Sequence, residues 1–170
     1  MRCKELERLV FDQSILAVAQ EYLKCSPVLD LVAFWWSLPY EGKGKSEAAQ
    51  MYHFDMDRIK FIKFFFYLTD VDDESGPHAM VRGTHSRKRL GHQVTLRRFT
   101  DEEIERAYGL DHVVTIRGDA GAGFAEDTGC IHKGIPPRTR DRLALQIEFG
   151  LRDYALAHDE RPPSQLRRIV

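Results

Sequence analysis

Cysteine is scarce in this sequence, and the few cysteines that occur are widely spaced. Cys3, Cys25 and Cys130 are the three in the chain, and none forms a C-x-x-C pair with another. Structural zinc sites and the disulfide frameworks of small secreted proteins both need closely or regularly spaced cysteines. The sequence therefore predicts neither, and we expect a reducing compartment, the cytoplasm.

The chain also lacks an excess of charge of either sign. Its 25 Lys and Arg residues stand against 26 Asp and Glu residues, which gives a formal net charge of −1. Proteins dedicated to nucleic acids carry a surplus of basic residues that neutralises the phosphates. We therefore expect no nucleic-acid partner.

Long hydrophobic runs are absent as well. The N-terminal segment carries Glu5, Glu7 and Asp12 before any apolar run reaches the length of a signal-peptide core. The most apolar later stretch, Leu31 to Tyr40, is about half as long as a membrane span. We expect neither a signal peptide nor a membrane-spanning segment.

What the chain does contain is the composition of one globular domain, with 170 residues of which 43% are hydrophobic. Residues 1–46 are predicted to form a helical layer. Apolar residues recur there at three- and four-residue steps, as on one face of a helix: Leu6, Leu9, Val10, Leu16, Ala19, Tyr22 and Leu23. A second apolar segment of this layer, Val28 to Leu38, lies between Pro27 and Pro39. We expect Trp35 and Trp36 to pack this layer onto a sheet.

Strand signals dominate residues 47–150. Phe61 to Val71 is dense in aromatic residues, as in a strand buried on both faces, and His112 to Arg117 is a further strand. Arg142 to Phe149 alternates polar and apolar residues, as in a strand with one face on a core. A short helix is expected near Asp101 to Ala107. The pattern predicts a mainly β sandwich or jelly roll, with the N-terminal helices packed outside one sheet.

Three separated features carry candidate chemistry. In His53-Phe54-Asp55, strand alternation would point an imidazole and a carboxylate to the same side. His132 follows the glycine-rich stretch that begins at Gly118, and Arg142 comes ten residues later. Two histidines and one carboxylate on one side of a metal are the ligands of non-haem Fe(II) oxygenases. The planar guanidinium of an arginine suits bidentate binding of a carboxylate such as that of 2-oxoglutarate.

Each feature taken alone is more typical of ordinary structure. A His-x-Asp triplet is frequent by chance, a single histidine before a loop is usually solvated or in the core, and an arginine at the start of a strand is usually a surface charge. The order and spacing of the three together favour a metal site.

The sequence also resembles a known family over residues 50–149. The resemblance is carried by Gln50-Met-Tyr-His-Phe-Asp55, Phe61 to His78, Val81-Arg-Gly-Thr-His85, Gly118-Asp119 and the segment from His132 to Arg142. These motifs, in this order, are similar to those of the phytanoyl-CoA dioxygenase superfamily of Fe(II)- and 2-oxoglutarate-dependent oxygenases.

The resemblance implies a double-stranded β-helix of the cupin-like kind, in which His53, Asp55 and His132 bind Fe(II) and Arg142 binds 2-oxoglutarate. It implies a dioxygenase that consumes O2, hydroxylates a small organic substrate and releases succinate and CO2. Halogenating relatives have a small residue in place of the carboxylate, so Asp55 favours hydroxylation or desaturation. Two alternatives remain: a catalytically silent cupin-like metal-binding protein, and a nucleic-acid demethylase of the same chemistry.

Other side chains are candidates for the edge of the site. Lys63 and Tyr67 share one face of the aromatic strand and are candidate 2-oxoglutarate contacts, as is Gln50. His78 and His85 are expected at the edge of the pocket rather than on the metal, and Cys130 is expected to be a small core residue. The basic residues Arg87-Lys-Arg89 and Arg97-Arg98 form either a surface loop or a site for an anionic group of the substrate.

Overall fold

The computed structural model describes residues 3–40, 49–56, 58–93 and 97–152. Its helices are α1 (Lys4–Val10), α2 (Gln13–Leu23), α3 (Leu90–Gln93) and α4 (Asp101–Tyr108), with one 3₁₀ turn, η1 (Leu110–His112). Its strands are β1 (Val28–Ser37), β2 (Phe61–Tyr67), β3 (His78–Val81), β4 (Val113–Ile116), β5 (Gly123–Glu126), β6 (His132–Gly134) and β7 (Arg142–Gly150). The chain is therefore mainly β, as expected.

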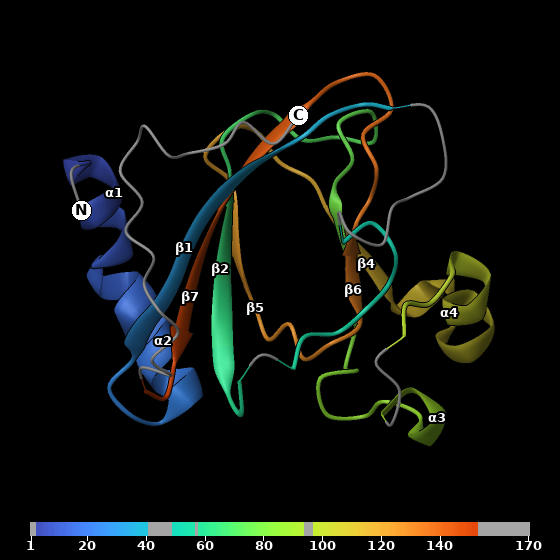
Figure 1. The fold of residues 1–170 in the computed structure, drawn as a ribbon, viewed down its shortest axis with the longest axis horizontal. Coiled ribbons are helices and arrows are strands. Elements are labelled where there is room, and N and C mark those ends of the chain that lie inside the picture. Colours follow the sequence, from blue (N-terminus) through green and yellow to red (C-terminus); the bar gives the residue numbers. More distant parts are fainter. Residues whose placement is uncertain (1–2, 41–48, 57, 94–96, 153–170) are drawn as a thin grey trace.

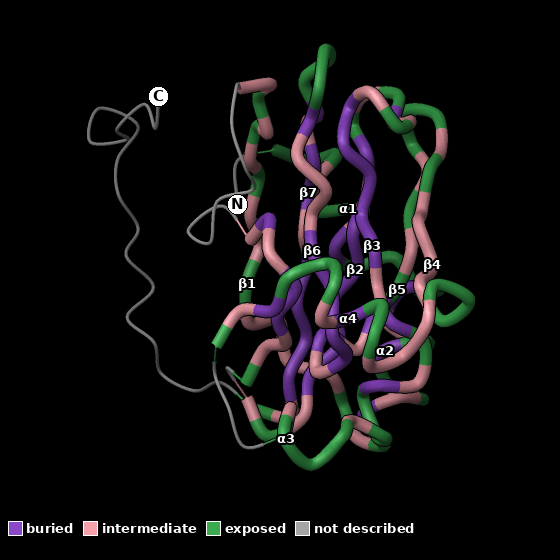
Figure 2. Tube along the Cα trace, turned by 90° about the vertical axis from the view of Figure 1, so that its right-hand side faces the viewer, coloured by how far each residue is buried: buried purple, intermediate pink, exposed green. Residues whose placement is uncertain are grey.

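The strands form two antiparallel sheets that lie side by side (Figure 1). The larger sheet has the order β1-β7-β2-β5, and the smaller has the order β4-β3-β6. Helices α1 and α2 lie on the outer side of the larger sheet, whereas α3 and α4 lie beyond the smaller one (Figure 1). Buried residues concentrate in the strands of both sheets (Figure 2). The sequence-based expectation of helices packed outside one sheet is confirmed.

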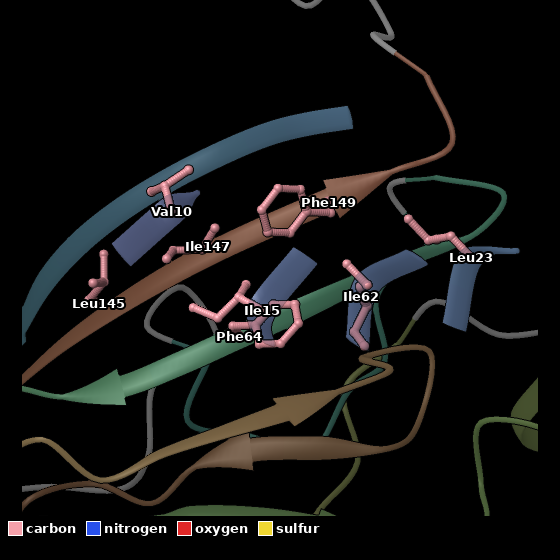
Figure 3. Close-up of a cluster of buried hydrophobic side chains, with 9 residues drawn as sticks. Val10, Ile15, Leu23, Ile62, Phe64, Leu145, Ile147 and Phe149 are labelled. Atoms are coloured by element: carbon pink, nitrogen blue, oxygen red, sulfur yellow. The ribbon is translucent and has the colours of Figure 1, made fainter. Parts of the chain in front are cut away.

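The alternation of β7 explains how the larger sheet receives the helices. Leu145, Ile147 and Phe149 point to the outer face and pack with buried residues of α1, α2 and β2 (Figure 3). Each of the three is 2% exposed or less, and full burial of such a side chain contributes about 1.5–3 kcal/mol to stability. Ala144 and Gln146 point to the opposite, inner face, where they line a cavity between the two sheets.

The N-terminal apolar stripe is divided between two helices. Helix α1 ends at Val10, and the side chain of Asp12 accepts hydrogen bonds from the backbone N–H groups of Ser14 and Ile15 at the start of α2. This cap satisfies donors that a helix start otherwise leaves unpaired. The stripe residues of both helices still share one core.

The expectation that residues 1–46 are helical throughout was wrong for Val28 to Leu38. This segment is strand β1, which pairs with β7 from Val28–Gly150 to Ser37–Arg142. Its β-branched and aromatic residues favour a strand, and pairing with β7 satisfies its backbone hydrogen bonds. The two tryptophans also differ from expectation, because Trp35 lines the inner cavity and Trp36 is 55% exposed.

The smaller sheet has its own core against α4. Ile104 of this helix packs with Val81, Phe99 and Ile131. Thr100 and Glu103 form a capping box, in which each side chain accepts a hydrogen bond from the backbone N–H of the other residue. The expected helix near Asp101 is confirmed. Among the helices of the described residues, none has the length and apolar character that a membrane span requires.

Candidate metal and cosubstrate site

The two candidate histidines face each other across an antiparallel bridge between the His53 segment and β6. The backbone N–H of His53 donates to the carbonyl of His132 at 2.9 Å, and that of His132 donates back at 2.7 Å. The centres of the two imidazole rings are consequently 4.3 Å apart. Residues that are 79 positions apart in the sequence are thus held on one wall of the inner cavity.

Backbone carbonyls orient both rings in the same way. Nδ1 of His53 lies 2.9 Å from the carbonyl oxygen of Met51, and Nδ1 of His132 lies 3.0 Å from that of Cys130. A carbonyl oxygen only accepts, so each Nδ1 carries the proton and each Nε2 keeps a free lone pair. This is the tautomer that a metal-binding histidine needs.

Asp55 completes the group that the sequence predicted. Its Oδ1 lies 3.7 Å from Nε2 of His53, and its Oδ2 lies 3.9 Å from Nε2 of His132. One ligand atom from each of the three residues lies within 4.8 Å of the other two. We call His53, Asp55 and His132 the triad. The structure brings them together as one carboxylate and two imidazoles directed at a common point.

The protonation states of the triad suit a cation. Burial, together with the nearby His132, lowers the pKa of His53 to about 3. Burial also lowers the pKa of His132. Burial raises the pKa of Asp55, but His132, Lys63 and His53 outweigh this effect, so the pKa lies below its ordinary value. At neutral pH the triad therefore consists of two neutral imidazoles and a carboxylate.

Lys63 is a close neighbour of the triad. Its Nζ donates to Oδ2 of Asp55 at 2.7 Å and lies 3.5 Å from Oε2 of Glu148. The lysine enters from β2, on the same inner face as Tyr67, as strand parity predicted. An ammonium group at this place neutralises the Asp55 carboxylate inside a buried site.

Arg142 forms part of the opposite wall of the same cavity. The residue is only 6% exposed, and burial lowers the pKa of its guanidinium. One nitrogen, Nη2, donates to Oγ of Ser37 at 3.0 Å, whereas Nε and Nη1 are buried without an acceptor among the described residues. A buried guanidinium with two unpaired donors is ready to bind an anion.

The remaining predicted contacts divide into two kinds. The ring of Tyr67 lines the cavity, but its hydroxyl donates to the carbonyl of Ile116 at 2.8 Å and accepts from the N–H of His78 at 3.0 Å. The structure does not bring Gln50 to this cavity, and its side-chain oxygen accepts from the hydroxyl of Tyr40 at 2.7 Å. Tyr67 is thus held by backbone groups.

The cavity between the sheets has a volume of about 220 Å³ and joins the triad to Arg142. Its other walls are largely aromatic, with Trp35, Phe65 and Phe124 among the lining residues. Drug-sized ligands occupy about 300–1,000 Å³, so the size fits a small organic acid. The predicted basic residues at positions 87–89, 97 and 98 do not line it.

A buried contact between a histidine and a carboxylate beside the triad was not found from the sequence. Nε2 of His78 lies 2.7 Å from Oε2 of Glu126, and the ring of His78 stacks on that of His132 with centres 5.5 Å apart. Strand parity places Glu126 inside the sandwich, but nothing in the sequence signals which histidine it meets.

A scan of protein-family models and a search of curated proteins both found no match for this chain. Solved structures do match. AviO1 from Streptomyces viridochromogenes has a TM-score of 0.59 and 19% identity over 86% of this chain and 60% of its own. HygX from Streptomyces hygroscopicus, solved with nickel and 2-oxoglutarate bound, has a TM-score of 0.60 and 15% identity over 87% of this chain and 67% of its own.

The third of these structures is SnoK, a non-haem α-ketoglutarate-dependent carbocyclase from nogalamycin biosynthesis. It has a TM-score of 0.57 and 18% identity over 85% of this chain and 58% of its own. This chain has the fold of non-haem oxygenases. The resemblance that the sequence motifs indicated is thereby confirmed at the level of the fold. The chain spans only about three fifths of AviO1 and SnoK.

Proposed function

We propose that this chain is an Fe(II)- and 2-oxoglutarate-dependent dioxygenase with the double-stranded β-helix architecture, hydroxylating a small organic substrate with release of succinate and CO2. The observation that carries the proposal is the pairing of two complementary sites in one cavity. A ligand set of two imidazoles and one carboxylate lies on one wall, and a buried guanidinium with two unpaired donors lies on the other.

The donor groups fit the two cofactors. Two neutral histidines and an aspartate bind one side of a cation and leave the opposite positions open, as non-haem Fe(II) oxygenases require. The free donors of Arg142 match the two oxygens of a carboxylate. Bound Fe(II) and 2-oxoglutarate would supply the activation of O2.

The side chains of this chain then have separate tasks. His53, Asp55 and His132 hold the cation, and the carbonyls of Met51 and Cys130 keep the two imidazoles turned toward it. Arg142 holds the distal carboxylate of 2-oxoglutarate and thereby fixes its distance from the triad. The aromatic walls exclude water, which strengthens both interactions because the local dielectric is low.

A second cavity is the candidate binding place for the organic substrate. It has a volume of about 340 Å³ and shares one lining residue, Asp55, with the first. Its lining includes Phe54, Lys60 and Lys88, and Lys88 belongs to the basic cluster that the sequence singled out. Three basic residues line this cavity against two carboxylates, which favours a small substrate with an anionic group: Arg58, Lys60 and Lys88 against Asp55 and Asp127.

The experiment is a turnover assay with Fe(II), O2 and 2-oxoglutarate. We expect iron-dependent formation of succinate even without the organic substrate, because binding of Fe(II) and 2-oxoglutarate needs only the triad and Arg142. His132→Ala, which lacks one ligand, should give none. A folded, iron-loaded wild-type protein that forms no succinate contradicts the proposal.

One observation favours a second candidate, a catalytically silent metal-binding protein. Lys63 places its ammonium group 2.7 Å from Asp55, and this pairing leaves the two imidazoles as the main ligands of a bound cation. Anaerobic addition of 2-oxoglutarate to the Fe(II) protein separates the two functions. The oxygenase should develop a metal-to-ligand charge-transfer band in the visible, whereas the silent protein should bind iron without one. In the silent protein, Lys63→Met should tighten metal binding.

A further inference from the structure

A second group of buried ligand atoms shares His132 with the triad, whereas its other two side chains have no part in the function proposed above. It comprises Glu126 at the end of β5, His132 at the start of β6 and Cys130 between them. One ligand atom of each lies within 4.8 Å of the others, and all three residues are buried. We propose that this group is a second cation site, with a preference for soft divalent cations of the Zn²⁺ class.

The charges of this group match a divalent cation. The thiol of Cys130 donates to Oε1 of Glu126 at 2.8 Å. When a cation takes the place of that proton, the proton leaves to solvent, and a thiolate and a carboxylate carry two negative charges. The imidazole of His132 adds no charge. A buried divalent cation is thus neutralised by its own ligands, which removes the main penalty for burying it.

His78 is the candidate for a fourth ligand. Its Nε2 lies 2.7 Å from Oε2 of Glu126, yet neither atom makes a hydrogen bond of acceptable geometry with any described residue. His78 is 9% exposed and Glu126 is 4% exposed, so neither atom is open to bulk solvent. The two atoms are in direct contact, so Nε2 of His78 becomes a ligand only when a cation displaces this contact.

The type of ligand decides the type of cation. Thiolate sulfur selects zinc and other soft cations over magnesium, calcium and manganese. A set of one sulfur, one carboxylate oxygen and two imidazole nitrogens is a full tetrahedral set for zinc. The triad has no sulfur, so the two neighbouring sites differ in preference although His132 belongs to both. A cation in one of them therefore competes for His132 with a cation in the other.

Cobalt(II) is the probe that tests this site, because it replaces zinc and its bond to a thiolate gives an intense near-ultraviolet charge-transfer band. Metal-free, reduced protein is titrated with Co²⁺ under anaerobic conditions. We expect the sulfur-to-cobalt band to grow to saturation in the wild type and to be absent in Cys130→Ala. Glu126→Gln should lower the affinity for Co²⁺, measured from the growth of this band, by at least about tenfold.

Two control variants separate this site from other sources of the signal. Cys25→Ala removes a cysteine outside the group, and His53→Ala removes a ligand of the triad alone, so both should keep the band. No sulfur-to-cobalt band in folded wild type at saturating Co²⁺ overturns the proposal. So does a band that survives in Cys130→Ala while circular dichroism shows the native fold. Neither readout depends on 2-oxoglutarate turnover, so this site and the proposed oxygenase function stand or fall separately.

Discussion

His53 and His132 exchange a pair of backbone hydrogen bonds, of 2.9 Å and 2.7 Å, and so present their imidazoles side by side. Because each Nδ1 is also held by a backbone carbonyl, the backbone fixes both the position and the tautomer of the two rings. The two imidazoles of the candidate metal site are therefore positioned by main-chain contacts alone.

The first prediction concerns metal binding by the triad. His132→Ala leaves only two of the three ligands. The affinity for Ni²⁺, an oxygen-stable substitute for Fe(II), should therefore fall by more than about a hundredfold. Changes to residues that only orient the ligands typically lower metal affinity by about 10–100-fold. Isothermal titration calorimetry measures it. His112→Ala, an exposed histidine of η1, is the matched control and should bind Ni²⁺ like the wild type.

The second prediction concerns Arg142. Arg142→Lys keeps the positive charge but loses the planar pair of donors, so affinity of the Ni²⁺-loaded protein for 2-oxoglutarate should fall by about 10–100-fold, the equivalent of one charge-assisted hydrogen bond. Arg140→Lys, at an exposed arginine beside Asp72, should leave the affinity unchanged. Unchanged affinity in Arg142→Lys would transfer the assignment to Arg138 or Arg140.

The third prediction follows from the low pKa of His53, about 3 in the folded protein. In the unfolded chain this group takes up a proton near pH 6.5, whereas the folded protein keeps it neutral, so the stabilisation is present above pH 6.5 and is lost as pH falls toward 3. The metal-free protein should lose about 2 kcal/mol from this residue between pH 7 and pH 5. Urea unfolding at both values measures it, and His53→Gln should show a loss smaller by that amount.

The fourth prediction concerns the turn before β3. Gly76 has φ of +75°, and a Cβ there would come within 2.2 Å of the carbonyl oxygen of Ile135. Gly76→Ala should therefore destabilise the fold by more than the roughly 1–2 kcal/mol that a left-handed backbone alone costs. Gly83 has φ of +78° with nothing within 4 Å of such a Cβ, so Gly83→Ala isolates the backbone cost. Equal thermal shifts in the two variants would contradict the steric argument.

Local patterns were sufficient to predict some elements. The strict alternation of β7 predicted both its core face and its cavity face, because a strand has a period of two. The helical period predicted the residues of α1 and α2 that reach the core, but not the break at Asp12. Val28 to Leu38 was assigned to the wrong class because its strand state depends on β7, more than a hundred residues later.

For the candidate site, too, the sequence predicted which residues take part but not all of their contacts. His53, Asp55, His132 and Arg142 were singled out by order and spacing, and the structure brings all four to one cavity. The contacts of Lys63 with Asp55 and of His78 with Glu126 could not be predicted. Each joins side chains of different strands, and the sequence alone does not determine which residues oppose one another across the sandwich.

The pairing of β1 with β7 also constrains when the site can exist. Ser37, at the end of β1, contacts Arg142, which follows it by 105 positions. During synthesis on the ribosome, β1 cannot pair with β7 until nearly the whole described chain has been made. Such distant pairing is slow to form. A nascent chain thus has no closed cavity until β7 has been made, because the wall that carries Arg142 depends on this pairing.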